Sequence, residues 1–199
     1  MADSLNRDPA CLESCFAGQF GAPVPRAGLT FAAHTALTLI DLRGDPQDAA
    51  FLASARAALG TALPLNPNTA VAGKGCEVLW LGPDEWLLAG RDPTPINERL
   101  PIERGFLTDV SHGRAGWRIG GPRALDLLAK GCSLDLHPRA FRAGDCAQTV
   151  LAHVGVLLHR HDTGSFDIYC ARSYAQHLWH SLTGAAAEFG YAVAATTGE

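Results

Sequence analysis

The sequence lacks the long apolar runs and the concentrated positive charge on which two large classes of binding protein depend. No stretch of its 199 residues approaches the roughly 18 consecutive apolar residues of a membrane-spanning helix. Residues 1–8 contain no apolar run of the kind found in a signal peptide. The 16 Lys and Arg residues are scattered and the net charge is −4, whereas nucleic-acid binding needs a clustered basic face. We therefore expect a cytoplasmic protein that binds neither membranes nor nucleic acids.

The motifs of common cofactor and metal sites are absent as well. The six cysteines are irregularly spaced and form no C-x-x-C pair, so in a reducing compartment they are expected to be mostly buried free thiols. No G-x-G-x-x-G follows a strand and opens a helix, which argues against a flavin or NAD bound by this chain alone. We expect no complete catalytic, cofactor-binding or metal-binding site.

Charged residues are scarce, at 18% of the chain against a usual share of about 25%. A partner that covers part of the surface would explain this deficit, and so would the dilution of Lys and Glu by many Ala and Gly residues. The length and the 47% of hydrophobic residues allow one large domain or two small ones with a sizeable core.

The stretch 109–136 combines a strand, a tight turn and a helix. Apolar and polar residues alternate over 116–119, as in a half-buried strand. Pro122 suits the first position of a helix over 122–130, and Gly131 is predicted to end that helix in the left-handed conformation.

Apolar periodicity and turn residues predict two units of the order β-α-β-β-α. The predicted strands lie at 36–42, 76–81, 86–89, 116–119, 149–160 and 165–171, and the predicted helices at 47–59, 95–100, 122–130 and 173–182. Asp45 is expected to cap the first helix and Gly60 to end it. The fold class is therefore α+β with a duplicated unit.

The predicted organisation has three parts within one compact body. Residues 1–29 contain many Pro and Gly residues and are predicted to form an N-terminal arm. The first β-α-β-β-α unit covers 30–105, and the second covers 106–199.

Two motifs carry a resemblance to a known superfamily. The sequence DVSH (109–112), followed after eight residues by GPRA (121–124), resembles the opening signature of the folate-dependent aminomethyltransferases, which include the glycine-cleavage T-protein. The continuation KGCSLDL (130–136) is similar to one branch, the gamma subunits of heterotetrameric sarcosine oxidase. The similarity extends from about Leu37 to Tyr191. Members of the superfamily combine ferredoxin-like units, so the resemblance implies that the duplicated units are of this type.

The branch implies a non-catalytic, structural role in an enzyme complex. Such complexes oxidatively demethylate sarcosine to glycine, with formaldehyde or 5,10-methylenetetrahydrofolate and hydrogen peroxide as the other products. The resemblance implies alpha, beta and delta subunits as partners, with FAD, FMN, NAD, zinc and tetrahydrofolate on those other subunits. An alternative is a free-standing folate-dependent aminomethyltransferase-like protein, although the T-protein relatives are nearly twice as long. A related assembly factor would act through Cys132, but the residues that follow Cys132 in such proteins are absent here.

A histidine group on one predicted strand is the first candidate for metal binding. His159 and His161 flank Arg160, so both rings lie on one face, and His153 would share that face if no bulge intervened. Histidines on a half-exposed sheet face, or against a partner, are the simpler interpretation, and we expect no metal here.

The remaining histidines and cysteines form weaker patterns. His137, Cys132 and Cys146 have no spacing typical of a zinc site. His177 and His180 stand three residues apart on a helix whose apolar stripe indicates packing first.

Asp109, Ser111 and His112 include the residue types of a hydrolase triad. Closeness in sequence does not make a triad, and no G-x-S-x-G surrounds Ser111. Cys132 follows a predicted helix end, where the negative pole of the helix disfavours a reactive thiolate. We therefore predict a packing role for Cys132.

Contact residues are predicted from the enrichment of Arg and aromatic residues at the centres of protein interfaces. The candidates are Arg114, Trp117, Trp179 and, in the arm, Phe16 and Phe20.

Overall fold

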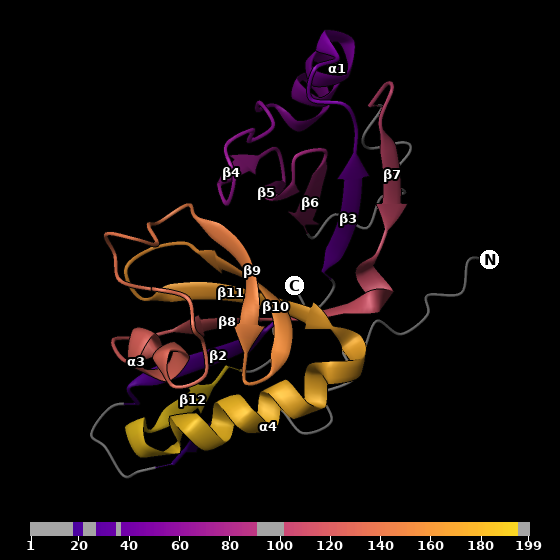
Figure 1. Cartoon of the computed structure of the whole chain (residues 1–199). Helices are drawn as coiled ribbons and strands as arrows, with labels where there is room; N and C mark the ends of the chain where they lie inside the picture. Colours follow the sequence, from indigo (N-terminus) through magenta and orange to yellow (C-terminus); the bar gives the residue numbers. More distant parts are fainter. Residues whose placement is uncertain (1–17, 22–26, 35–36, 91–101, 195–199) are drawn as a thin grey trace, which may run out of the picture. The chain divides into compact units, whose positions relative to one another are not determined.

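The computed structural model describes residues 18–21, 27–34, 37–90 and 102–194, and it divides the chain into two compact units (Figure 1). Of the described residues, unit 1 comprises 18–21, 27–34, 112–143 and 148–194, and unit 2 comprises 37–90, 102–111 and 144–147. A seven-stranded and a five-stranded sheet are accompanied by helices. The predicted α+β class is confirmed.

The described part of unit 2 consists of an antiparallel five-stranded sheet of order β4-β5-β6-β3-β7 and one helix, α1. Its elements are β3 (Thr38–Arg43), α1 (Ala49–Leu59), β4 (Ala70–Gly73), β5 (Cys76–Gly82), β6 (Glu85–Gly90) and β7 (Phe106–Asp109). Phe51, Ala55 and Leu59 recur at every fourth position and form the buried face of α1. Phe51 packs against Trp86 of β6, with ring centroids 5.9 Å apart, so the helix and the sheet share one core.

Unit 1 contains the seven-stranded sheet, of order β1-β12-β2-β8-β11-β10-β9. The elements are β1 (Gly18–Phe20), β2 (Leu29–Ala33), η2 (Ser111–Gly113), β8 (Arg114–Gly120), α3 (Ala124–Ala129), β9 (Cys146–Leu151), β10 (Val154–Arg160), β11 (Ser165–Ala171), η3 (Arg172–Tyr174), α4 (Ala175–Ala186), η4 (Ala187–Phe189) and β12 (Tyr191–Val193). Trp179 of α4 packs against Phe31 of β2 at 5.4 Å and Trp117 of β8 at 6.4 Å between ring centroids. The long helix α4 therefore covers one face of the central strands, as Figure 1 shows.

The two sheets share one connectivity. Four strands lie in the order β4-β5-β6-β3 in the sheet of unit 2 and in the order β9-β10-β11-β8 in the sheet of unit 1. In each set the strand that comes first along the chain, β3 or β8, is followed by a helix, α1 or α3. The expected β-α-β-β-α order missed β4 in the first predicted unit and joined β9 and β10 in the second. The strands β2, β7 and β12 were not predicted either, and β1 and the start of β2 lie within the predicted arm over 1–29. β4 was missed because it is short and follows a segment rich in Pro and Asn, and β9 was missed for a different reason.

A hairpin divides the segment predicted as one strand over 149–160. Ala152 and His153 have φ values of 49° and 65°, so they form a tight turn between β9 and β10. Two successive positive φ values suit the twist of a two-residue hairpin and usually select Gly or Asn, and neither residue type stands at this turn. The strand prediction was wrong here, and His153 lies in the turn rather than beside His159 and His161.

The start of α1 also differs from the prediction. Asp48, not Asp45, is the N-cap, because its Oδ1 accepts hydrogen bonds from the N–H groups of Ala50 at 2.9 Å and Phe51 at 3.4 Å. Asp45 stabilises the preceding turn, where its Oδ1 accepts a bond from the N–H of Gln47 at 2.8 Å.

Helix ends were predicted with mixed success. Gly60 ends α1 with φ of 70°, and the Gly60 N–H donates to the Arg56 carbonyl at 2.9 Å, as predicted. Gly131 is not left-handed, because α3 ends earlier and Lys130 at its C-cap keeps right-handed helical angles. The helix predicted over 95–100 lies outside the described residues.

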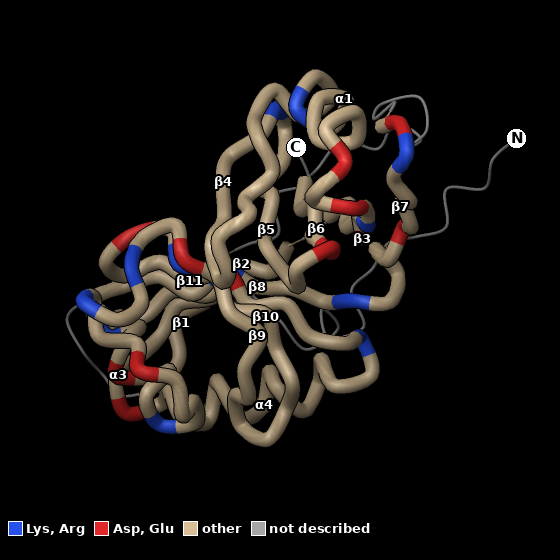
Figure 2. Tube along the Cα trace, turned by 45° about the horizontal axis from the view of Figure 1, so that its top comes forward, with Lys and Arg blue, Asp and Glu red and all other residues tan. Residues whose placement is uncertain are grey.

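Charged residues of both signs are spread along the chain, and the helices are short. Figure 2 shows Lys and Arg interspersed with Asp and Glu in both units. Among the described residues, every helix is too short or too polar to span a lipid bilayer.

Replacing Gly60 by Ala is expected to lower the free energy of unfolding by about 1 kcal/mol, because a Cβ strains the left-handed backbone. Steric crowding is small, since the nearest atom to a Cβ at this position is Lys74 Cβ at 3.6 Å. Urea denaturation measures the effect. Gly60→Asn is the matched control and should lose less stability, because Asn tolerates this conformation; equal losses would contradict the backbone explanation.

Candidate functional site

Asp167 is a buried carboxylate in the central strands of the sheet of unit 1. It lies on β11, directly opposite Arg118 of β8 and His159 of β10. Direct cross-strand neighbours project from the same face of a sheet. His161 and Tyr169 follow His159 and Asp167 by two residues, so they share this face with them.

Four side chains meet the carboxylate of Asp167. Arg118 donates from Nε to Oδ1 and from Nη2 to Oδ2, both at 2.8 Å. His161 Nε2 lies 2.7 Å from Oδ2, and His34 Nε2 lies 2.9 Å from Oδ1. Tyr169 donates its hydroxyl to Oδ2 at 3.3 Å. Both oxygens are therefore fully engaged, and the two-point contact with Arg118 is the strongest geometry for such a pair.

The charge of Asp167 is maintained by these partners. Burial disfavours the charged form, but hydrogen bonds from Arg118, His161 and His34 outweigh burial and hold the pKa of Asp167 well below its usual range. Asp167 is consequently a permanent carboxylate at neutral pH.

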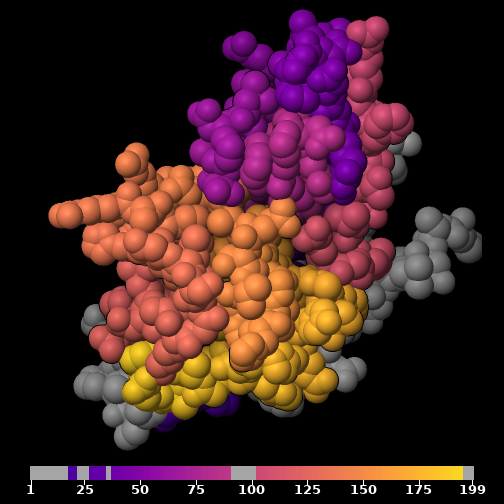
Figure 3. Space-filling view, viewed as in Figure 1, coloured from indigo at the N-terminus to yellow at the C-terminus, as the bar shows by residue number. Residues whose placement is uncertain are grey.

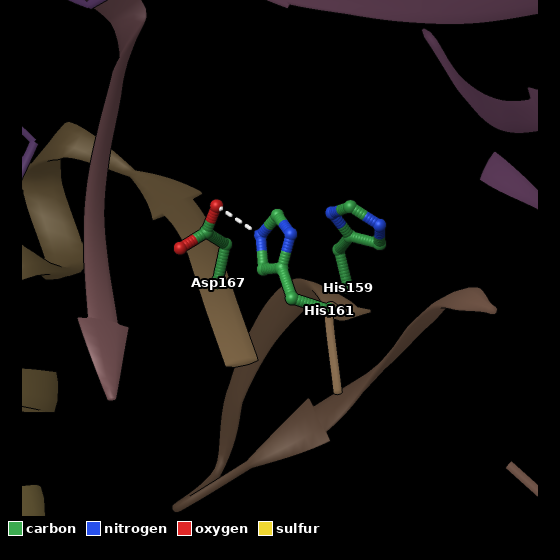
Figure 4. Close-up of side chains that lie close together, drawn as sticks. All are labelled: His159, His161 and Asp167. Atoms are coloured by element: carbon green, nitrogen blue, oxygen red, sulfur yellow. Dashed lines mark hydrogen bonds and ion pairs between the residues drawn. The ribbon is translucent and has the colours of Figure 1, made fainter. Parts of the chain in front are cut away.

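His159 lies beside this network and is itself 3% exposed. Its ring centroid is 4.2 Å from that of His161, and Figure 4 shows the two rings side by side with Asp167 on the far side of His161. Burial, together with the neighbouring His161 side chain, lowers the pKa of His159 from 6.5 to about 4. His159 is therefore neutral at pH 7.

The arrangement is suited to holding strands together. It links β8, β10, β11 and the residue after β2 through one carboxylate whose lone pairs are all used. His159 and His161 were predicted from the sequence as candidates, whereas Asp167 and His34 were not. An acidic residue inside the apolar run FDIYC (166–170) was the available signal for Asp167, because a charge there needs a buried partner.

Ser111 has a structural role in unit 2. Its hydroxyl donates to Oδ1 of Asp109 at 2.5 Å, and its N–H donates to the same oxygen at 2.9 Å. The N–H of Leu39 on β3 donates to Ser111 Oγ at 2.9 Å. These contacts close the end of the β3–β7 pair, so the described geometry gives Ser111 the part of a turn residue.

A cavity of about 660 Å³ in unit 1 brings together Cys132, His153 and His177. It lies between α3, the β9–β10 turn and α4, whose surfaces adjoin one another in Figure 3. Cys132 is fixed in its wall by a backbone bridge to Leu151, and its Sγ lies 3.8 Å from Thr149 Oγ1. The cavity is a mainly apolar hollow with polar groups along its lining.

Other candidate ligands serve local structure. Cys146 is buried and donates its thiol to the carbonyl oxygens of Thr69 at 3.4 Å and Trp80 at 3.5 Å, and burial raises its pKa to about 12. His137 Nδ1 accepts a bond from the N–H of Arg139 at 3.2 Å. His180 is exposed on α4.

The predicted contact residues occupy different environments. Trp117 is fully buried and Trp179 nearly so, because they stack on each other in the core of unit 1, which leaves Trp117 no surface for a partner. Arg114 is half-buried on β8. Phe20 is 40% exposed on β1 and stacks on Tyr191 at 5.4 Å. Phe16 lies outside the described residues.

Comparison with protein families identifies the chain. A family model described as the sarcosine oxidase, gamma subunit family matches residues 43–188, which is well over half of the sequence. The chain belongs to the sarcosine oxidase gamma subunit family.

Relatives within this family match almost end to end. Sarcosine oxidase subunit gamma of Corynebacterium sp. (strain P-1) is 35% identical over 194 residues, covering 94% of this chain and 92% of that protein. The Arthrobacter sp. subunit gamma is 35% identical with the same coverage. The Corynebacterium sp. (strain U-96) subunit gamma is 38% identical over 161 residues, covering 78% of each.

Solved structures agree with the family assignment. A chain of heterotetrameric sarcosine oxidase from Corynebacterium sp. U-96, in complex with pyrrole 2-carboxylate, matches with a TM-score of 0.75 and 33% identity, covering 85% of this chain and 88% of that chain. Glycine cleavage system aminomethyltransferase T from Bartonella henselae matches with a TM-score of 0.64 and 16% identity, covering 91% of this chain and 56% of that chain. The likeness to the aminomethyltransferase concerns the fold alone. The family model, the relatives and the oxidase structure confirm the predicted resemblance to a gamma subunit.

Asp167→Asn is expected to lower the free energy of unfolding of this gamma-family chain by about 3 kcal/mol, because it removes the charge that Arg118 and two histidines surround. Chemical denaturation at neutral pH measures the loss. Asp126→Asn is the matched control, since Asp126 pairs with Arg123 at the surface, where both side chains are half exposed, and should change little. Similar losses in the two variants would contradict the importance assigned to the buried network.

The pH dependence of stability should report on His159. Its pKa is about 4 in the folded chain and 6.5 ordinarily, so the unfolded chain binds the proton first as the pH falls. Stability should therefore decline between these two values, by about 3 kcal/mol in total from this residue.

His159→Gln should flatten this part of the curve of unfolding free energy against pH, measured by urea denaturation between about pH 7 and 4.5. His180→Gln is the control, because His180 is exposed, and it should leave the curve unchanged. Parallel curves for the wild type and the His159 variant would show that His159 is not the titrating group.

Proposed function

We propose that this chain is the gamma subunit of a heterotetrameric sarcosine oxidase and that its role in the complex is structural. The complex would demethylate sarcosine oxidatively to glycine, with hydrogen peroxide and either formaldehyde or 5,10-methylenetetrahydrofolate as products. The observation that carries the proposal is the end-to-end match to curated gamma subunits, at 35% identity over 92% of their length.

The geometry of the described residues supports a structural role. The Asp167 carboxylate has its oxygens fully engaged, and Ser111 is used in a turn. Neither group is placed as a nucleophile with a free base beside it, which is the arrangement that covalent catalysis needs. The chemistry of the complex would therefore reside on its other subunits.

The other subunits would be the alpha, beta and delta chains. They would carry FAD, FMN, NAD, zinc and the tetrahydrofolate site, and the complex would work in the cytoplasm. The low share of charged residues, at 18%, fits a chain whose surface is partly covered by permanent partners.

Arg114 and Phe20 are the contact residues that we propose. Phe20 stands on β1, an edge strand of the seven-stranded sheet, where its exposed ring is available to a partner. Arg114 begins β8 and is half-buried. Phe16 and the rest of the arm over 1–29 remain part of the same proposal.

We also propose that the two units derive from one duplicated ferredoxin-like unit. The repeated strand order supports the duplication. We propose residues 30–105 and 106–199, the bounds predicted from the sequence, as the extents of the two copies.

A free-standing aminomethyltransferase is not favoured. The chain covers 56% of the matched aminomethyltransferase chain, whereas it covers 88% of the matched chain of the oxidase. Those lengths fit a subunit better than the whole transferase.

Native mass spectrometry of the tagged chain, purified from its own organism, tests the proposal. We expect one assembly with three further polypeptides and a flavin mass, and the same preparation should release hydrogen peroxide when sarcosine is added. The untagged strain, processed identically, is the control for carry-over. A bare monomer or a homo-oligomer would overturn the subunit role, and tight tetrahydrofolate binding by that species would support the transferase instead.

A further inference from the structure

We propose that His159 and His161 form a binding site for a divalent transition-metal ion, with the ion held between the two imidazole rings and Asp167 bonded to the back of His161. His159, His161 and Asp167 all lie in unit 1, and the inference goes beyond the proposed subunit role.

The two rings are placed as a pair of ligands. His159 lies on β10, and His161 directly follows the end of that strand. Residues two apart along a strand project from the same face, and the two ring centroids are 4.2 Å apart. Figure 4 shows a nitrogen of each ring turned toward the other ring. One ligand atom from each of His159, His161 and Asp167 lies within 4.8 Å of the other two. Among the described residues, these three form the group of His, Cys, Asp or Glu side chains that is close enough to hold one metal ion.

The contact with Asp167 orients His161 for metal binding. A ring nitrogen 2.7 Å from a carboxylate oxygen must carry a hydrogen, so His161 donates from Nε2 to Oδ2 of Asp167. In the neutral ring this leaves the lone pair on Nδ1, the nitrogen on the side of His159. Metal-binding histidines commonly donate their other N–H to a carboxylate in this way, which fixes the ring and raises its basicity.

His159 supplies the second observation. The residue is 3% exposed, and its Nδ1 has no hydrogen-bond partner among the described residues. Buried polar atoms nearly always have a partner in the native state. An ion between the rings would provide one, whereas the protein groups around His159 do not.

The surrounding charges define which ion suits the site. Arg118 Nη2 lies 2.9 Å from His161 Nε2, but its positive charge is paired with Asp167. Asp167 is also engaged by His34 and Tyr169, so we assign it to supporting His161 rather than to direct coordination. Two imidazole ligands select ions such as Zn²⁺, Cu²⁺ or Ni²⁺ over Mg²⁺ and Ca²⁺, which prefer oxygen.

The site is open rather than closed. A structural zinc site has four protein ligands, and here the chain offers two, so the other positions are left for water or an added ligand. The His161 side chain is 21% exposed, which gives an ion access from that side. We therefore expect reversible binding of an exchangeable ion rather than an ion required for folding.

Calorimetry with zinc chloride tests the site in the full-length chain after removal of metal by a chelator. One Zn²⁺ per chain is expected, and His159→Asn and His161→Asn should each weaken binding by at least about tenfold. His177→Asn is the matched control, because His177 is an exposed histidine on α4, and it should bind zinc as the wild type does. Circular dichroism verifies that each variant is folded.

Nitrogen-15 NMR of the imidazole rings keeps the test independent of the variants. Zinc should move the Nδ1 resonances of His159 and His161 while the Nε2 of His161 keeps its proton. Absence of binding at millimolar zinc, or binding that survives both substitutions, would overturn the proposal. Loss of binding in the His177 variant alone would also overturn it, because the ion would then lie at the cavity beside α4.

Discussion

The buried carboxylate of Asp167 is the constraint around which the larger unit is built. A charge that is 2% exposed is tolerated inside a protein only with close partners of opposite charge or hydrogen-bond donors. Arg118, His161 and His34 satisfy this need from three other places in the chain, and Tyr169 does so from the same strand, β11. The register of β8 and β10 against β11 is therefore fixed on one face by polar contacts, and on the other face by the packing of α4.

The same constraint explains why the central strands of unit 1 are suited to a structural role. A carboxylate whose oxygens accept hydrogen bonds from Arg118, His161, His34 and Tyr169 has no lone pair left to act as a base, and the neighbouring His159 is 3% exposed. A sheet locked in this way offers a rigid body for assembly with other chains. This agrees with membership in a family of gamma subunits, and it leaves the pair of imidazole rings as the part of the network with unused bonding capacity.

Sequence patterns predicted those elements whose signals are local. Strands with alternating apolar residues, such as β8 and β11, were found because period-2 alternation depends only on neighbours along the chain. Gly60 was found for the same reason. The β9–β10 hairpin was missed because Ala152 and His153 adopt positive φ values without the usual Gly or Asn; packing of the two strands, rather than turn propensity, selects that conformation.

The sequence by itself determined the family, the α+β class and the placement of His159 and His161 on one face of a strand, since each rests on motifs or spacing within short stretches. Only the tertiary structure decided that Asp167 sits opposite Arg118, 49 residues away in the chain, and that His34 completes the network. Such pairings depend on strand register and sheet order, which arise from packing of the whole unit and leave no mark in local spacing. Trp117 shows the same limit, because an aromatic residue of the core and one of an interface look alike in sequence.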